Sequence, residues 1–244
     1  PTPPPEPEEA PLLAVVTITL ALAALALAAT LVQSHVSAIV AVGGVGYLIA
    51  ILFAAAITDN ILLTRFLGMC SFLSVSRQMK SALGLGLAVV FVTTATTAIN
   101  SVLYRQVLIP LEKAYGVPAD TMILILFIVV IAAFVQLMEM FIERVSLGLY
   151  FSLGIFLPLI TVNCAILGSS LFMVTRQLDL LGSLIFGLGN GLGWWLAIML
   201  MAGIRTRLRN ARIPPALDGA GITLIIAGIM ALAFMGYSGM IQVQ

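Results

Sequence analysis

Two cysteines, Cys70 and Cys164, are the most informative candidates for chemistry in this chain of 244 residues. Each lies in an apolar stretch that is interrupted nearby, by Gly68 in one case and by Pro158 in the other. Interrupted helices can expose a thiol at membrane depth, where it suits a metal ligand. An iron–sulfur cluster needs about four protein ligands, usually thiolates, so two cysteines form half of such a site. The alternative is that both are small buried hydrophobic residues, as free cysteine often is.

Polar residues inside apolar stretches form the second group of candidates. Asp59, Asn60 and Arg65 lie within the same interrupted stretch, and Glu139 lies in a later one. Glu139 shares a helical face with Gln136, because the two are three residues apart. Ionisable groups at membrane depth are costly and indicate either an ion path or structural pairing. Both interpretations stay open for Asp59, Asn60 and Glu139.

The chain offers no conventional catalytic set, so we expect no catalytic residues. A Ser-His-Asp or Cys-His arrangement is not expected from the single histidine, His35, which lies in a short connection. Four glycines between 187 and 193 do not have the dinucleotide-binding spacing, and no predicted strand precedes them. Close packing of helices explains this cluster better, and the same holds for Trp194 and Trp195 inside that segment.

The composition indicates the class of protein that contains these candidate residues. Apolar residues make up 61% of the chain and charged residues 9%, with a mean hydropathy of +1.18. Soluble domains carry about 25% charged residues. With a net charge of +1, these values exclude a water-soluble enzyme, a disordered chain and a nucleic-acid-binding protein. The chain is predicted to be an all-α polytopic membrane protein.

Apolar segments of about 20 residues, the length that crosses a bilayer, divide the chain. Residues 1–11, rich in proline and glutamate, are predicted to be a disordered tail, and residues 12–33 are predicted to be an extra N-terminal transmembrane helix. A broken segment follows at about 39–75. Five further spans are expected at about Ser81–Tyr104, Thr121–Phe141, Leu147–Phe172, Leu180–Ala202 and Gly219–Met240.

Loop charges and a short repeat predict the topology. Seven lysines and arginines fall on the membrane side of Arg77 and three on the opposite side, which makes the first side cytoplasmic and the C-terminus periplasmic. Val-Ser-Arg77-Gln-Met is echoed by Val-Thr-Arg176-Gln-Leu, and the charge count places the two turns on opposite faces. This predicts two inverted three-helix repeats with broken helices, and both arginines at solvated surfaces. Chance similarity in a chain of restricted composition is the alternative.

Three strings carry a family resemblance: Phe-Leu-Gly-Met-Cys at 66–70, Gly-Ile-Phe-Leu-Pro-Leu-Ile-Thr-Val-Asn-Cys at 154–164, and Phe-Met-Gly-Tyr-Ser-Gly at 234–239. The chain resembles the E subunit of the sodium-pumping NADH:quinone reductases, the Nqr complexes. The resemblance covers 46–240, the six-helix core. The same superfamily includes the A subunit of the Rnf electron-transport complexes, but Gly-Trp-Trp-Leu-Ala-Ile at 193–198 is more similar to the sodium pump. Residues 1–45 depart from the family pattern.

The resemblance implies an electron-relay subunit in the bacterial inner membrane. By that resemblance, Cys70 and Cys164 are ligands to the iron of a [2Fe–2S] cluster shared with the homologous D subunit. Other subunits of the six-subunit complex bind NADH and the flavins, and electron transfer is coupled to sodium translocation. No nucleic acid is expected as a partner; membrane lipid is.

Two other functions compete with this one. A secondary ion transporter built from inverted repeats would use Asp59 and Glu139 at its ion site. A scaffold without a cluster would tolerate loss of Cys70.

Overall fold

The computed structural model describes residues 44–115, 119–145, 157–208 and 219–236. The predicted tail at 1–11 and the extra helix at 12–33 lie outside these residues, as do the beginning of the predicted span Leu147–Phe172 and the end of Gly219–Met240.

All regular secondary structure in the described ranges is helical, which confirms the predicted fold class. The elements are α2 (Gly44–Phe53), η1 (Ala54–Thr58), α3 (Met69–Val75), α4 (Met79–Leu103), η2 (Tyr104–Leu108), α5 (Ile109–Tyr115), α6 (Ala119–Val145), α8 (Leu157–Thr161), α9 (Cys164–Thr175), α10 (Leu180–Leu208) and α11 (Ala220–Met235), with η1 and η2 in the π-helical form. Among the residues that the structure describes, three stretches are long and apolar enough to cross a membrane: Met79–Lys113, Met122–Phe141 and Leu180–Leu208.

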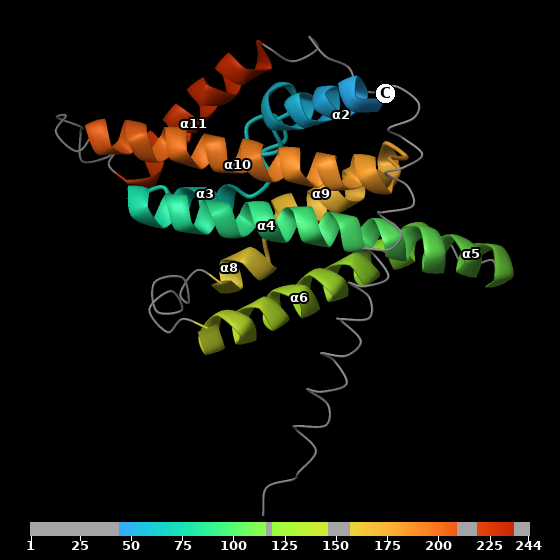
Figure 1. Cartoon of the computed structure of the whole chain (residues 1–244). Coiled ribbons are helices and arrows are strands. Elements are labelled where there is room, and N and C mark those ends of the chain that lie inside the picture. The colour runs from blue at the N-terminus through green and yellow to red at the C-terminus, as the bar shows by residue number, and fades with distance from the viewer. Residues whose placement is uncertain (1–43, 116–118, 146–156, 209–218, 237–244) are drawn as a thin grey trace, which may run out of the picture.

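Helices α4 and α10 lie side by side along the centre of the molecule (Figure 1). Glycines of α10 make this close approach possible: a Cβ added at Gly191 would lie 2.8 Å from the Cα of Val90, and one at Gly187 would lie 2.9 Å from the Cβ of Thr97. Trp194 is fully buried in the same helix. The glycine cluster is therefore a packing device, as predicted.

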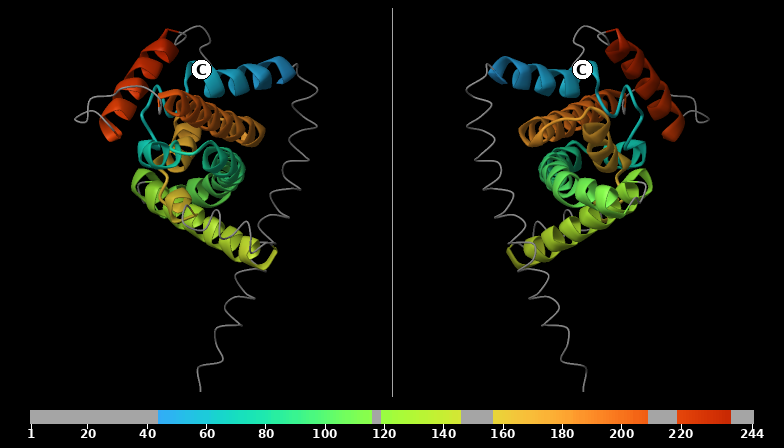
Figure 2. Two further views of the ribbon diagram at one scale, coloured as in Figure 1. Left: turned by 90° about the vertical axis from the view of Figure 1, so that its left-hand side faces the viewer. Right: turned by 90° about the vertical axis from the view of Figure 1, so that its right-hand side faces the viewer.

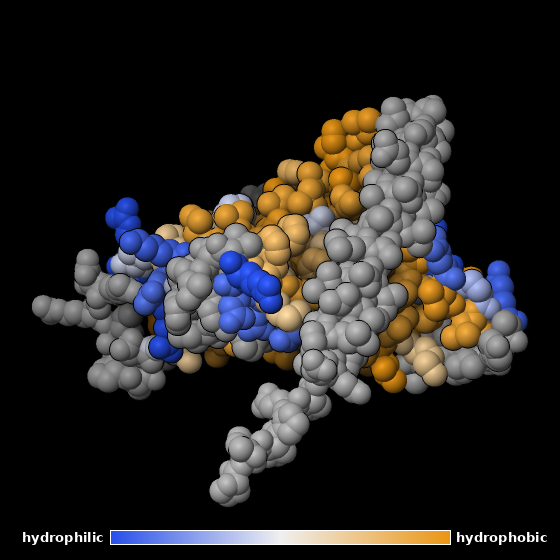
Figure 3. Space-filling model, turned by 60° about the horizontal axis from the view of Figure 1, so that its bottom comes forward, coloured by the Kyte–Doolittle hydropathy of each residue, from blue (hydrophilic) through white to orange (hydrophobic). Residues whose placement is uncertain are grey.

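The other helices cover this pair in layers. Helices α2 and α11 lie on the α10 side, whereas α6 and α8 lie beyond α4 (Figure 2). Apolar side chains dominate the middle of the face seen in Figure 3, and hydrophilic residues gather toward its two ends. This distribution is what a chain surrounded by hydrocarbon requires.

Two interrupted segments enter the core between these layers. The first runs from α2 and η1 through residues 59–68 into α3, and the second runs from α8 through Val162 and Asn163 into α9. The turn before α4 and the turn before α10 lie at opposite ends of the bundle (Figure 1). The arrangement agrees with the predicted opposite placement of the turns at Arg77 and Arg176.

The two interruptions share a short sequence pattern. The repeat of the Arg-Gln turns did not reveal it. Each contains the pattern Ile-Thr-x-Asn, ending at Asn60 in the first segment and at Asn163 in the second. Both asparagines are buried, and both accept hydrogen bonds from backbone N–H groups that the broken helix leaves free. The paired pattern marks the equivalent positions of the two breaks.

Candidate functional site

The structure brings the two cysteine segments together where α3 and α9 begin. Cys164 is the first residue of α9, and Cys70 is the second residue of α3. The backbone N–H of Gly68, which precedes α3, donates to the sulfur of Cys164 at 2.9 Å. Gly68, two residues before Cys70, therefore contacts Cys164, which lies 96 positions further along the chain.

Gly68 permits this contact for two reasons. Its φ is +83°, in the left-handed region that only glycine adopts without strain. A Cβ at this position would lie 2.7 Å from Trp194 Nε1 and 2.9 Å from Asn163 Oδ1. Both the backbone conformation and the space around it thus exclude a side chain.

Hydrogen bonds fix the two helix starts relative to each other. Asn163 caps α9 by accepting from the N–H of Ala165 at 3.0 Å, and its Nδ2 donates to Ser71 Oγ at 3.4 Å. Ser71 in turn donates to the carbonyl of Gly68 at 3.0 Å. The cap of one cysteine's helix is therefore bonded to the first turn of the other.

Neither cysteine is buried, and neither forms a disulfide. Their exposed neighbours are apolar: Phe66 is 51% exposed and Val162 is 73% exposed. The alternative of two small buried hydrophobic residues is therefore wrong for this chain. Both thiols instead lie at the surface of the chain, in segments with exposed apolar side chains.

Asn60 is fully buried, and its hydrogen-bonding groups are all used within the chain. Its Nδ2 donates to the carbonyls of Ala56 at 2.9 Å and Gly193 at 2.8 Å. Its Oδ1 accepts from the N–H groups of Leu62 at 3.1 Å and Leu63 at 3.2 Å. Asn60 thus ties the first break to α10, which favours the structural interpretation over the ion path.

Asp59 is the centre of an ion-pair cluster. Its carboxylate pairs with Arg65 at 3.3 Å and, through the other oxygen, with Arg176. The guanidinium groups also lie over aromatic rings, Arg65 over Phe172 and Arg176 over Phe186, each at 5.0 Å. The sequence predicts Arg176 at a solvated surface, but its side chain is only 23% exposed. That prediction is wrong, because the carboxylate of the other broken segment holds the guanidinium.

Glu139 stands apart from these residues. It lies on α6, is partly buried, and forms no ion pair or hydrogen bond with another residue of the described ranges. Gln136, one turn away, is exposed. Glu139 therefore is not part of the ion-pair cluster around Asp59.

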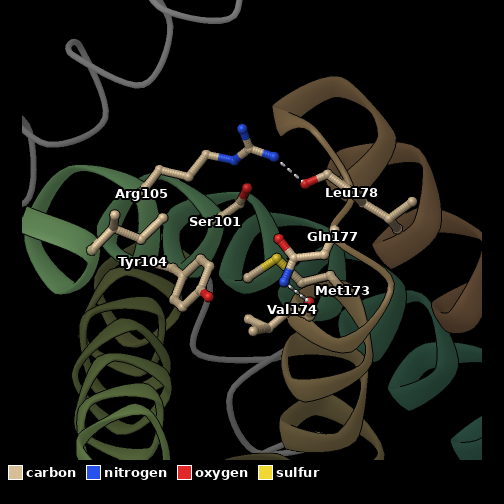
Figure 4. Close-up of a pocket in the computed structure, with 8 residues that line it drawn as sticks. Ser101, Tyr104, Arg105, Met173, Val174, Gln177 and Leu178 are labelled. Atoms are coloured by element: carbon tan, nitrogen blue, oxygen red, sulfur yellow. Dashed lines mark hydrogen bonds between the residues drawn. The ribbon is translucent and has the colours of Figure 1, made fainter. Parts of the chain in front are cut away.

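A pocket near the end of α4 is a feature that the sequence interpretation missed. It has a volume of about 70 Å³ and is lined by Ser101, Tyr104, Arg105, Ile109, Met173, Val174, Gln177 and Leu178. Figure 4 shows Arg105 reaching across it to donate to the carbonyl of Leu178. Within the described ranges, no three His, Cys, Asp or Glu residues form a group that could hold a metal ion.

Comparison with known proteins identifies the family. The family model described as "Rnf-Nqr subunit, membrane protein" matches residues 48–241. The chain belongs to the Rnf-Nqr family. The match includes both breaks and both cysteines, so the family resemblance predicted from the sequence is confirmed.

Individual relatives align over a similar length of the chain. The chain is 48% identical over 195 residues to the E subunit of the Na(+)-translocating NADH-quinone reductase of Psychromonas ingrahamii, with 78% of this chain and 96% of the relative aligned. It is 48% identical over 196 residues to the E subunit of the same enzyme from Dichelobacter nodosus, covering 78% and 97%. For the E subunit of Chlamydia trachomatis serovar L2 the identity is 48% over 198 residues, covering 79% and 81%.

Proposed function

We propose that this chain is the integral-membrane electron-relay subunit of a sodium-translocating NADH:quinone oxidoreductase. In this proposal Cys70 and Cys164 supply two thiolates to a [2Fe–2S] cluster, and a homologous partner, the D subunit, supplies the rest. Other subunits of the multisubunit complex bind NADH and the flavins. The complex lies in the bacterial inner membrane, with the C-terminus of this chain in the periplasm.

The hydrogen bond from Gly68 to the Cys164 sulfur carries the proposal. It holds the thiol of one broken segment beside the start of the helix that bears the other thiol. The exposed thiols and their apolar surroundings suit a site that a second membrane protein completes. When bound, such a cluster accepts and passes on a single electron.

The residues around the thiols suit this group. The Gly68 N–H stabilises negative charge on the Cys164 sulfur, and hydrogen bonds to sulfur are one means by which proteins set the potential of a cluster. Hydrogen bonds of Asn163 and Ser71 fix the first turns of α3 and α9 relative to each other. These supporting contacts reduce the motion of each ligand and thereby orient it.

The test is to compare Cys164→Ala and Cys70→Ser with a matched control in the purified whole complex. Val162→Ala serves as the control, because it trims an exposed side chain two residues from Cys164 without removing a thiol. We expect each cysteine variant to lose the iron of one [2Fe–2S] cluster, the electron paramagnetic resonance signal of that cluster, and quinone reduction. Oxidation of NADH with an artificial acceptor should persist, because other subunits perform it.

An unchanged cluster signal with normal quinone reduction in either cysteine variant would overturn the proposal. So would equal losses in Val162→Ala, because the effect would then arise from the contact between subunits and not from the ligand.

A further inference from the structure

Three buried oxygen atoms on α4 lack hydrogen-bond partners among the described residues. They are Thr97 Oγ1, Asn100 Oδ1 and Ser101 Oγ, on residues that are 0%, 0% and 1% exposed. Residues three and four apart share one face of a helix, so the three atoms point to the same side. Buried polar atoms are almost always bonded, and an unbonded group indicates an ordered water or an ion.

The rest of α4 shows that these atoms are an exception. The hydroxyls of Thr93, Thr94 and Thr96 each donate at 2.7 Å to the carbonyl four residues earlier. That bond is the usual way to satisfy a hydroxyl in an apolar helix. Thr97 and Ser101 do not use it, so their oxygens remain available for another ligand.

Two neighbouring helices enclose the three oxygens. Gly187 of α10 lies against Thr97, and a Cβ there would lie 3.0 Å from Thr97 Oγ1. Ser170 of α9 accepts from Asn100 Nδ2 at 2.9 Å, which leaves Oδ1 as the free atom of that carboxamide. The oxygens therefore face a seam between α4, α9 and α10.

The pocket gives this seam an opening. Ser101 is one of the residues that line it (Figure 4). Two irregularities of the backbone also lie there: the π-helix η2 begins at Tyr104, and Gln177 has a φ of +51°. Both kinds of irregularity are frequent at binding sites.

We propose that Thr97, Asn100 and Ser101 bind a small monovalent cation. The choice of Na⁺ as the probe rests on the proposed function in a sodium-translocating complex. All three offer neutral oxygen lone pairs, and no carboxylate is among them, whereas divalent cations are held mainly by carboxylates. The C-terminal end of α9, the negative end of its dipole, lies at the same pocket through Val174. At the opening, the guanidinium of Arg105 is turned toward the Leu178 carbonyl, to which it donates.

Thr97→Val tests the site with a nearly isosteric change. Thr96→Val is the matched control, because Thr96 is also 0% exposed and adjacent, yet its hydroxyl is already bonded to Val92. The purified whole complex is titrated with NaCl against choline chloride at constant ionic strength. The shift of the thermal unfolding midpoint measures binding, since a ligand that binds the folded state stabilises it.

We expect the half-saturating Na⁺ concentration to rise about tenfold in Thr97→Val, the change that the loss of about 1.4 kcal/mol of binding free energy produces. The half-saturating Na⁺ concentration should stay within about twofold of the original value in Thr96→Val, and Thr97→Ser should keep the original value because it retains the hydroxyl. Ser101→Ala should act like Thr97→Val and supplies the test if the valine variant assembles poorly. If Ser101→Ala and Thr97→Val both match the control, the oxygens bind water only and the proposal is overturned.

This outcome is distinct from that of the cluster proposal. Iron content and the cluster signal should be unchanged in Thr97→Val, because the site contains neither cysteine. Absence of a cluster from the unmodified complex would refute the electron-relay function and would leave the Na⁺ titration readable.

Discussion

Gly68→Ala should be the most damaging single-methyl change in the cysteine site. An alanine in the left-handed conformation costs about 1–2 kcal/mol. Its Cβ would also lie 2.7 Å from Trp194 Nε1 and 2.9 Å from Asn163 Oδ1, and overpacking of this kind costs about 1–3 kcal/mol. Together these terms give about 3 kcal/mol, a large fraction of the stability of a typical domain.

The strain falls on the contact between the two cysteine segments. Relief requires moving Gly68 away from Asn163, which lengthens the hydrogen bond from Gly68 to the Cys164 sulfur. The whole complex carrying Gly68→Ala should therefore show a lower midpoint of thermal inactivation and less iron per complex. Quinone reduction should fall in proportion to the iron.

Gly203→Ala provides the matched control. Gly203 lies inside α10, and the nearest atom to an added Cβ is the terminal carbon of Met79 at 3.8 Å. Alanine in an open helical position stabilises a helix by about 0.5–1 kcal/mol relative to glycine. If Gly68→Ala left iron content and thermal inactivation indistinguishable from those of Gly203→Ala, the reasoning about backbone and space at Gly68 would be refuted.

Two further predictions concern the first break. Asn60→Ala should strongly lower the midpoint of thermal unfolding of the complex. The change leaves the Gly193 carbonyl and two backbone N–H groups buried without this partner, at a cost of about 1–3 kcal/mol each. A midpoint equal to that of the unmodified complex would contradict the capping role. Asp59→Asn and Arg176→Ala should be non-additive in a double-mutant cycle, with a coupling of about 1 kcal/mol because both side chains are still partly exposed. Strict additivity of the two changes would show that the ion pair does not contribute to stability.

Composition and local pattern determined the fold class, the first break and the candidate thiols. A chain with 61% apolar residues must bury its backbone polar groups in helices, which requires no knowledge of the tertiary contacts. Gly68 marked the first break, because its backbone freedom is a local property of one residue. Pro158 predicted an interruption near Cys164, but it lies inside α8, and the second break comes at Val162 and Asn163. Cys70 and Cys164 stood out because no other residue in the chain offers a thiol.

Only the tertiary structure decided which of these groups meet. Arg176 resembles any arginine at the end of a helix, and its pairing with Asp59 depends on a segment 117 residues away along the chain. The bond from Gly68 to Cys164 spans 96 residues, and the tie from Asn60 to Gly193 spans 133. Thr96 and Thr97 are alike in sequence, yet one hydroxyl is bonded and the other is not. Such differences arise from the rotation and packing of whole helices, so they cannot be predicted from the residue types alone.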